Sequence, residues 1–140
     1  KMEQDLKEAF TLAKHLAPNL LSAANHGDAL FATVSRMDGA FGFKQKETIY
    51  PVQGGLAGLA KTAAIEWEPV TCHALDIDPD WQDWPRVAEA VVEQLFRPSD
   101  LGAVETGLSF KGRMHLGLQP ATVLEKAPTL SPGDVVVVIE

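Results

Sequence analysis

The stretch that decides the fold is PVQGGLAGLAKTAAIEWEPVTCHALDID, at residues 51–78. Small residues and leucines recur at helical spacing over 52–67, which predicts a helix with one face able to approach a sheet closely. Pro69 ends this helix, and 70–78 forms a short apolar run typical of a buried strand. A helix followed at once by a strand indicates a βαβ unit, so we expect a parallel strand reached by a right-handed crossover.

The neighbouring segments complete such a sheet. Residues 29–35 (ALFATVS) have the composition of a buried strand preceding the helix. An amphipathic stretch over 1–17 predicts a helix that Pro18 ends. After the second strand, Asp83 can cap a further helix with Pro85 in its first turn.

The pattern changes near the C-terminus. Apolar residues alternate over 104–110 and again over 114–118, which predicts a β-hairpin with Lys111 and Gly112 at its turn. The Pro132-Gly133 turn precedes an apolar run at 134–139 that is typical of a buried parallel strand. The predicted fold class is therefore α/β, a short, mostly parallel, doubly wound sheet with flanking helices and an appended β-hairpin.

Composition and charge exclude several functions. The chain has 140 residues and a formal net charge of −7, which disfavours binding to nucleic acid or to an anionic membrane surface. The single cysteine, Cys72, cannot form a disulfide within the chain and favours a reducing compartment. No apolar run approaches the roughly 18 residues of a membrane span, so we expect a cytoplasmic location.

Two segments imitate ligand-binding motifs. The glycine-rich start of the helix, residues 54–58, lacks the G-x-G-x-x-G spacing of a dinucleotide loop, so we interpret its small residues as packing residues. The series Asp76, Asp78 and Asp80 resembles the start of a calcium loop. Position six of that loop is Trp81 instead of glycine, and position twelve is Val87 instead of glutamate.

The remaining candidates for chemistry are isolated side chains. Cys72 and His73 are adjacent on one strand and should point to opposite faces, and the histidines lie on four different elements: His15, His26, His73 and His115. We therefore predict no metal site. Ser35 ends a strand at the edge of the sheet where open α/β folds bind ligands, although a structural role accounts for it equally simply.

Four segments together resemble the ketoreductase region of multifunctional polyketide synthases and related polyunsaturated fatty acid synthases. They are TVSRMDG at 33–39, the stretch at 51–79, SFKGRMHLGL at 109–118 and LSPGDVVVVI at 130–139. This family contains two halves, each with a Rossmann-like fold of the short-chain dehydrogenase type. The resemblance implies that the first half is truncated and structural, whereas the second binds NADPH and carries a catalytic Ser, Tyr and Lys.

The resemblance assigns this chain to the structural half. The family runs Tyr-x-x-x-Lys ahead of a G-L-x-G-L-x-K-x-x-A-x-E helix, which matches Gly55, Leu56, Gly58, Leu59, Lys61, Ala64 and Glu66. Gln53 then stands at the Lys position and Ile49 at the Tyr position. Ser35 falls near the catalytic Ser, and Tyr50 is one residue from the missing Tyr, but a shift of one residue would place Gly54 at the Lys position.

The expected organisation follows from this assignment. Residues 1–120 form a truncated Rossmann-like subdomain, 121–133 a linker, and 134–140 the first strand of an NADPH-binding catalytic subdomain. We expect no cofactor in this segment, NADPH in the parent ketoreductase, and two partners: the catalytic subdomain of the same polypeptide and the acyl carrier protein of the synthase.

Two alternatives stay open. One is a non-enzymatic interaction module that docks through its apolar C-terminal strand. The other is a free-standing, divergent short-chain oxidoreductase that uses Ser35 and Tyr50 as catalytic residues.

Overall fold

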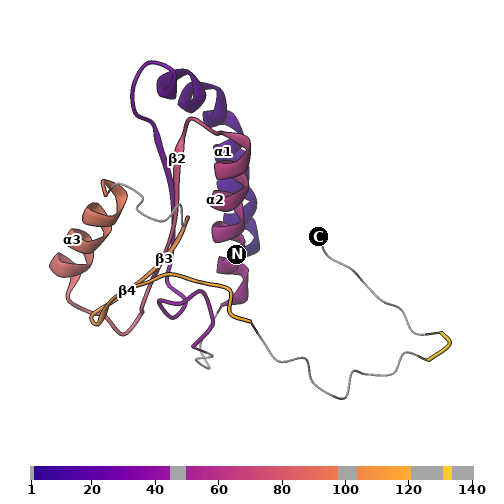
Figure 1. Cartoon of the computed structure of the whole chain (residues 1–140), viewed down its shortest axis with the longest axis vertical. Coiled ribbons are helices and arrows are strands. Elements are labelled where there is room, and N and C mark those ends of the chain that lie inside the picture. The colour runs from indigo at the N-terminus through magenta and orange to yellow at the C-terminus, as the bar shows by residue number, and fades with distance from the viewer. Residues whose placement is uncertain (1, 45–49, 98–103, 121–130, 134–140) are drawn as a thin grey trace.

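A computed structural model describes residues 2–44, 50–97, 104–120 and 131–133 (Figure 1). The elements in chain order are α1 (Met2–Ala24), β1 (Leu30–Ser35), the 3-10 helix η1 (Pro51–Gln53), α2 (Gly54–Glu66), β2 (Thr71–Ile77), α3 (Trp84–Leu95), β3 (Glu105–Ser109) and β4 (Gly112–Met114). The strand predicted at 134–139 and most of the predicted linker lie outside the described residues.

The strands form one sheet in the order β1-β2-β3-β4. The first three are parallel, with Leu30 beside Thr71 and Ala74 beside Glu105, and β4 runs antiparallel to β3. The mostly parallel α/β sheet and its appended hairpin are thus confirmed. The second hairpin strand is shorter than predicted, because it ends at Met114 and leaves the alternating Leu116 and Leu118 outside the ladder.

Helices cover both faces of the sheet (Figure 1). On one face of β2, Cys72 and Ala74 pack toward α1 and α2. On the other face, Leu75 and Ile77 pack against α3. Because the strand order follows the chain while α2 and α3 lie on opposite faces, the two crossover connections have opposite hands. The right-handed crossover rule therefore holds for only one of them.

Helix α1 continues to Ala24, so the prediction that Pro18 ends it is wrong. Proline in a helix interior costs about 3 kcal/mol because it removes a hydrogen bond and crowds the preceding turn. The turns beyond Pro18 pack Leu20, Leu21 and Ala24 against the core beneath α1. Burying a leucine contributes about 1.5–3 kcal/mol, so tertiary packing offsets the proline.

Alanines make the close contact between α2 and the sheet. Ala57, Ala60 and Ala63 are buried, and the first two contact Ala74 of β2. Gly58 has no atom within 4 Å of the position that a Cβ would take, so its predicted packing role is wrong. The side chain of Asp83 caps α3 by accepting a hydrogen bond from the backbone N–H of Arg86, as predicted. No helix within the described ranges is both long and apolar enough to cross a membrane.

Candidate functional site

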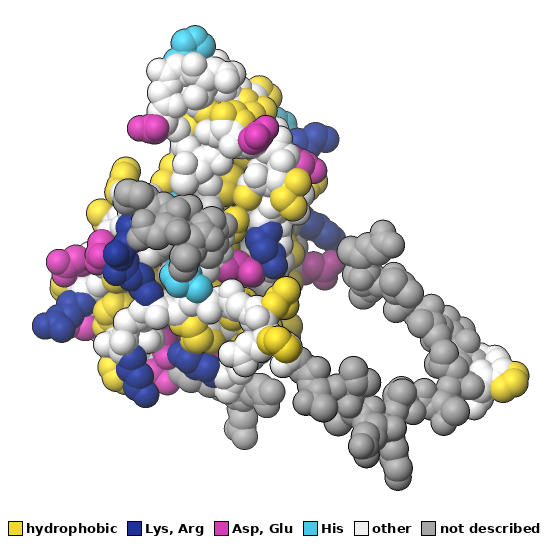
Figure 2. All heavy atoms as spheres, viewed as in Figure 1, with side chains coloured by type: hydrophobic (Ala, Val, Ile, Leu, Met, Phe, Trp, Pro, Cys, Tyr) yellow, Lys and Arg dark blue, Asp and Glu magenta, His cyan; other side chains and the backbone are white. Residues whose placement is uncertain are grey.

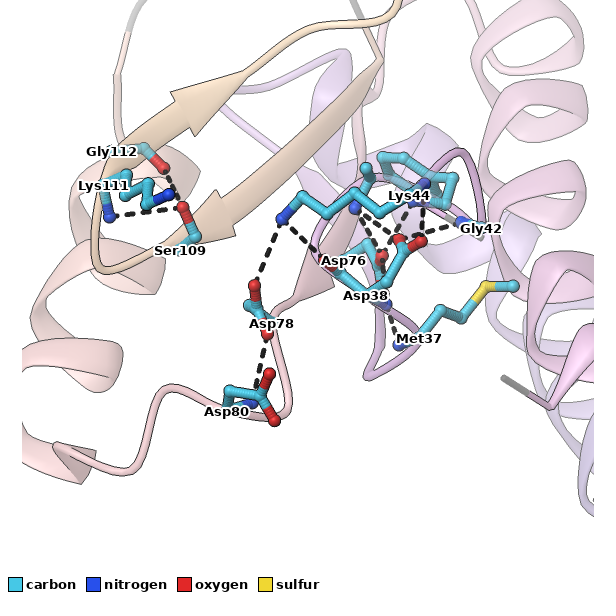
Figure 3. Close-up of polar contacts among 12 residues, drawn as sticks. Met37, Asp38, Gly42, Lys44, Asp76, Asp78, Asp80, Ser109, Lys111 and Gly112 are labelled. Carbon is cyan, nitrogen blue, oxygen red and sulfur yellow. Dashed lines mark hydrogen bonds and ion pairs between the residues drawn. The ribbon is translucent and has the colours of Figure 1, made fainter. Parts of the chain in front are cut away.

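The carboxyl ends of β1 and β2 form the sheet edge where open α/β folds bind ligands. Ser35 ends β1 at this edge, and the chain continues into a loop of residues 36–44, called the 36–44 loop below. Met37, Asp38 and Ala40 of this loop are buried. Figure 3 shows that Met37, Asp38 and Lys44 of this loop contact Asp76 and Asp78 at the end of β2. The loop therefore lies at the carboxyl end of the strands, where open α/β folds bind ligands.

Asp76, the second-last residue of β2, binds this loop through its side chain. Its side chain is fully buried, with 0% exposed. One carboxylate oxygen accepts hydrogen bonds from the hydroxyl of Ser35 at 2.8 Å and the N–H of Met37 at 2.7 Å. The other oxygen accepts from the N–H groups of Asp38 at 3.2 Å, Ala40 at 2.9 Å and Phe41 at 2.8 Å.

Five donors exceed the roughly four lone-pair positions of a carboxylate. Both oxygens of Asp76 are therefore occupied by the protein, and neither is open to a metal ion, a substrate or a proton in transfer. The buried charge is instead compensated by backbone N–H groups, which is the condition for burying a carboxylate.

A second aspartate closes the loop on itself. The Asp38 carboxylate accepts hydrogen bonds from the N–H groups of Ala40 at 2.8 Å, Gly42 at 2.9 Å and Lys44 at 2.9 Å. The Lys44 ammonium donates to the Asp38 carbonyl at 2.8 Å and to the Asp78 carboxylate at 3.1 Å (Figure 3). Lys44 thereby ties the loop to the residue that follows β2.

The loop also packs directly on the backbone of β3. A Cβ at Gly107 would overlap the carbonyl group of Gly39, so only glycine leaves room for this contact. Gly39 itself has φ +68, a left-handed conformation that glycine adopts without strain. The filled edge therefore depends on glycines in both the loop and the strand.

The two candidate catalytic residues lie in different environments. Ser35 is only 4% exposed, and its hydroxyl donates to Asp76 and to the carbonyl of Leu75 at 3.3 Å. Tyr50 is 56% exposed, and no hydrogen bond joins the two side chains within the described part of the chain. Ile49, at the family's Tyr position, lies outside the described residues.

Gln53, at the family's Lys position, holds the end of β1. Its side-chain carbonyl accepts a hydrogen bond from the backbone N–H of Arg36 at 2.8 Å. The side chain that a dehydrogenase would use as a cation is here a neutral acceptor for the main chain.

The candidate metal ligands remain dispersed. Asp76 faces the loop, Asp78 pairs with Lys44, and Asp80 is exposed. Among the residues that the structure describes, no three His, Cys, Asp or Glu side chains gather as a metal site would require. His15 of α1 contacts the Thr11 carbonyl of the same helix, and His26, in the turn after α1, contacts the Ser22 carbonyl of that helix.

Two buried groups on β2 have shifted pKa values. Burial raises the pKa of the Cys72 thiol and lowers the pKa of the His73 imidazole. His73 is 2% exposed, and neither ring nitrogen has a hydrogen-bond partner. Both groups are therefore held in their neutral forms, and they lie on opposite faces of the sheet, as alternation along a strand requires.

Comparison with models of known protein families, with curated proteins and with solved structures found no match to this chain.

The sequence predictions missed the residues that organise this edge. Asp38 and Lys44 were assigned no role, and Gln53 was identified only as the residue at the family's Lys position. Asp76 was interpreted as an aspartate at a strand end, without the loop that it binds. The sequence did contain one indication. Side chains alternate along a strand, so Asp76 lies on the same face of β2 as Cys72 and Ala74, which places a carboxylate on an apolar face.

Proposed function

We propose that this chain is the structural, non-catalytic subdomain of a β-ketoacyl reductase in a cytoplasmic polyketide or polyunsaturated fatty acid synthase. Its role is to pack against the NADPH-dependent half of the same polypeptide, which reduces β-ketoacyl groups carried by the acyl carrier protein. The observation that carries this proposal is the sheet edge filled by the 36–44 loop, where Asp76 accepts hydrogen bonds from five donors of the chain itself.

The groups at the family's catalytic positions support a structural role. A catalytic serine must present its hydroxyl to the substrate carbonyl, whereas the Ser35 hydroxyl is buried and bonded to Asp76. Gln53 carries no charge and serves the backbone of Arg36. The residues present thus suit loop anchoring better than hydride transfer or NADPH binding.

The surface of α1 and α2 supports packing against another subdomain. Phe10 and Leu12 of α1 and Ile65 of α2 are more than half exposed. A groove of about 310 Å³ separates the two helices, lined by Phe10, Ala13, Lys14, Ala17, Leu59, Thr62, Ala63, Glu66 and Trp67. Figure 2 shows apolar side chains reaching the surface among the charged ones. Exposed apolar side chains beside an apolar groove are a feature of interaction surfaces.

A matched pair of substitutions in the parent reductase tests this role. Ile65 is 83% exposed on α2 and Phe96 is 80% exposed at the end of α3, so neither Ile65→Glu nor Phe96→Glu should destabilise the isolated chain. In the parent enzyme, Ile65→Glu should lower the unfolding temperature and the rate of β-ketoacyl reduction, because it buries a charge at the interface. Phe96→Glu should leave both unchanged.

Equal behaviour of the two variants in the parent enzyme would contradict the proposed packing surface. Reduction of a β-ketoacyl thioester by the isolated chain would contradict the non-catalytic role itself.

A further inference from the structure

The two outermost strands of the sheet, β4 on one side and β1 on the other, differ in length and composition. At one edge, β4 has only three residues and carries Arg113, with Lys111 in the adjoining turn. Short length and positive charge are the features by which natural proteins prevent further strand pairing. At the other edge, β1 has six residues (LFATVS) with no charge, proline or glycine. β1 therefore has the composition of an interior strand, although β2 is its only partner among the strands that the structure describes.

The hydrogen-bond pattern shows which groups of β1 face outward. The N–H of Thr71 donates to the carbonyl of Ala29 at 2.9 Å, which sets the alternation along this parallel pair. Residues 31, 33 and 35 then bond toward β2, whereas Leu30, Ala32 and Val34 direct their N–H and C=O groups away from it. The described residues offer these outward groups no partner.

The next outward group confirms this alternation. The N–H of Arg36 also points away from β2, and the side chain of Gln53 accepts its hydrogen bond at 2.8 Å. Within the described part of the chain, Gln53 therefore caps the outward series at its carboxyl end, and the three positions before it are open for a strand.

A groove adjoins this open edge. It has a volume of about 250 Å³ and is lined by Asp5, Leu6, Val34, Val52, Gln53 and Leu56. Most of its walls are apolar, and Asp5 is the charged residue among them. An occupant that carries apolar side chains and one basic residue would complement both features.

Helix α1 excludes a second copy of the chain from this edge. Two copies paired antiparallel through β1 would keep their helices on the same face of the joined sheet. The second copy's α2 would then lie over its own β1 and β2, as α2 does here. α1 packs beside α2, and its Asp5 and Leu6 line a groove together with Val34 of β1. A second copy's helix would need about 8–10 Å beside α2, so it would compete with α1 for this space. A single extended strand needs only about 4.8 Å beside β1.

We propose that the open edge of β1 binds an extended peptide segment as a fifth strand, with apolar side chains and one basic residue near Asp5. The main-chain groups of Leu30, Ala32 and Val34 supply the hydrogen bonds, and the groove supplies side-chain selectivity. This inference holds whether or not the chain belongs to a ketoreductase.

Amide hydrogen exchange of the full chain, followed by NMR, tests this binding. The probe is a synthetic peptide as long as β1, with alternating valine and threonine and one lysine. Without the probe, the amides of Leu30, Ala32 and Val34 should exchange rapidly, while those of Phe31 and Thr33 should be protected. A saturating probe should slow the three outward amides about tenfold or more, as expected for newly hydrogen-bonded groups.

A proline at the centre of the edge provides the sharpest variant. Ala32→Pro removes an outward N–H without touching the β2 ladder, and should weaken probe binding about tenfold. Ala32→Thr keeps the N–H and should bind normally. A probe methylated on the amides that face β1 should not bind the unaltered chain, which keeps the test independent of how the proline variant folds.

Three results would overturn the proposal. The first is that Ala32→Pro binds the probe as tightly as the unaltered chain does, and that methylating the probe does not weaken its binding. The second is protection of the outward amides in the probe-free chain at every dilution, which would mean that the chain itself covers the edge. The third is protection that rises with protein concentration, which would identify a second copy as the occupant.

Discussion

Replacing Asp76 by asparagine should destabilise the chain severely while changing its size very little. Asparagine has one acceptor oxygen, and its amide group donates where the carboxylate accepts. The new amide group must therefore face either Ser35 and Met37 or the three backbone donors on the other oxygen. The Ser35 hydroxyl can turn to accept from the amide, but the backbone N–H groups cannot. In either case, buried N–H groups of the 36–44 loop face another N–H.

The magnitude follows from the number of lost bonds. A hydrogen bond to a charged group contributes about 1.5–3 kcal/mol. At least one such bond, that of the Met37 N–H, is lost outright, and the remaining donors lose a charged acceptor, so we expect a loss of about 2–5 kcal/mol. Domains of this size have a free energy of unfolding of about 5–15 kcal/mol. Asp76→Asn should thus leave the chain marginally folded or unfolded.

Urea unfolding followed by tryptophan fluorescence measures this loss. Asp28→Asn makes the same chemical change at an exposed residue and should shift the free energy of unfolding by less than about 0.5 kcal/mol. Amide exchange of Met37, Ala40 and Phe41 should accelerate in Asp76→Asn if the variant folds. A loss below about 1 kcal/mol, with these amides still protected, would refute the role assigned to Asp76.

Two further predictions concern glycine and pH. Gly107→Ala should lower the free energy of unfolding by about 2–4 kcal/mol, because its Cβ would overlap the Gly39 carbonyl. Gly58→Ala, in open space on α2, should raise it by up to about 1 kcal/mol. Urea unfolding that ranks the two variants otherwise would contradict the packing described. Burial lowers the pKa of His73 below its unfolded value of about 6.5, so the stability from its neutral form is present above pH 6.5 and is lost as the pH falls toward the folded pKa. Unfolding measured against pH should show this loss, and His73→Phe should lack it.

The helix and strand at residues 51–78 could be predicted because their signals are local. Spacing of small and apolar residues defines α2, and Pro69 separates it from β2. Pro18 shows the limit of such signals, since the packing of Leu20 and Leu21 on the core overrides the local effect of proline. The handedness of the crossovers could not be predicted from the sequence either, because it depends on which face of the sheet α3 covers.

The candidate site could be predicted only in part. Ser35 was correctly placed at the carboxyl edge of the sheet, because strand ends follow from the hydrophobic pattern. Its partner Asp76 lies 41 residues away in sequence, and the loop between them forms through hydrogen bonds to the backbone. Every residue except proline carries a backbone donor, so the sequence does not show which segment will bond to Asp76, although the position of Asp76 on the apolar face shows that its carboxylate needs donors.

A titration of the full chain with NADPH, followed by nicotinamide fluorescence, tests the central claim most directly. We expect no saturable change in emission up to about 1 mM NADPH, the upper end of usual KM values. The reason is that the 36–44 loop fills the ligand edge and Gln53 replaces the cation that would hold the ribose. Saturable binding with one NADPH per chain, lost in a Gln53 or Ser35 variant that stays folded, would contradict it.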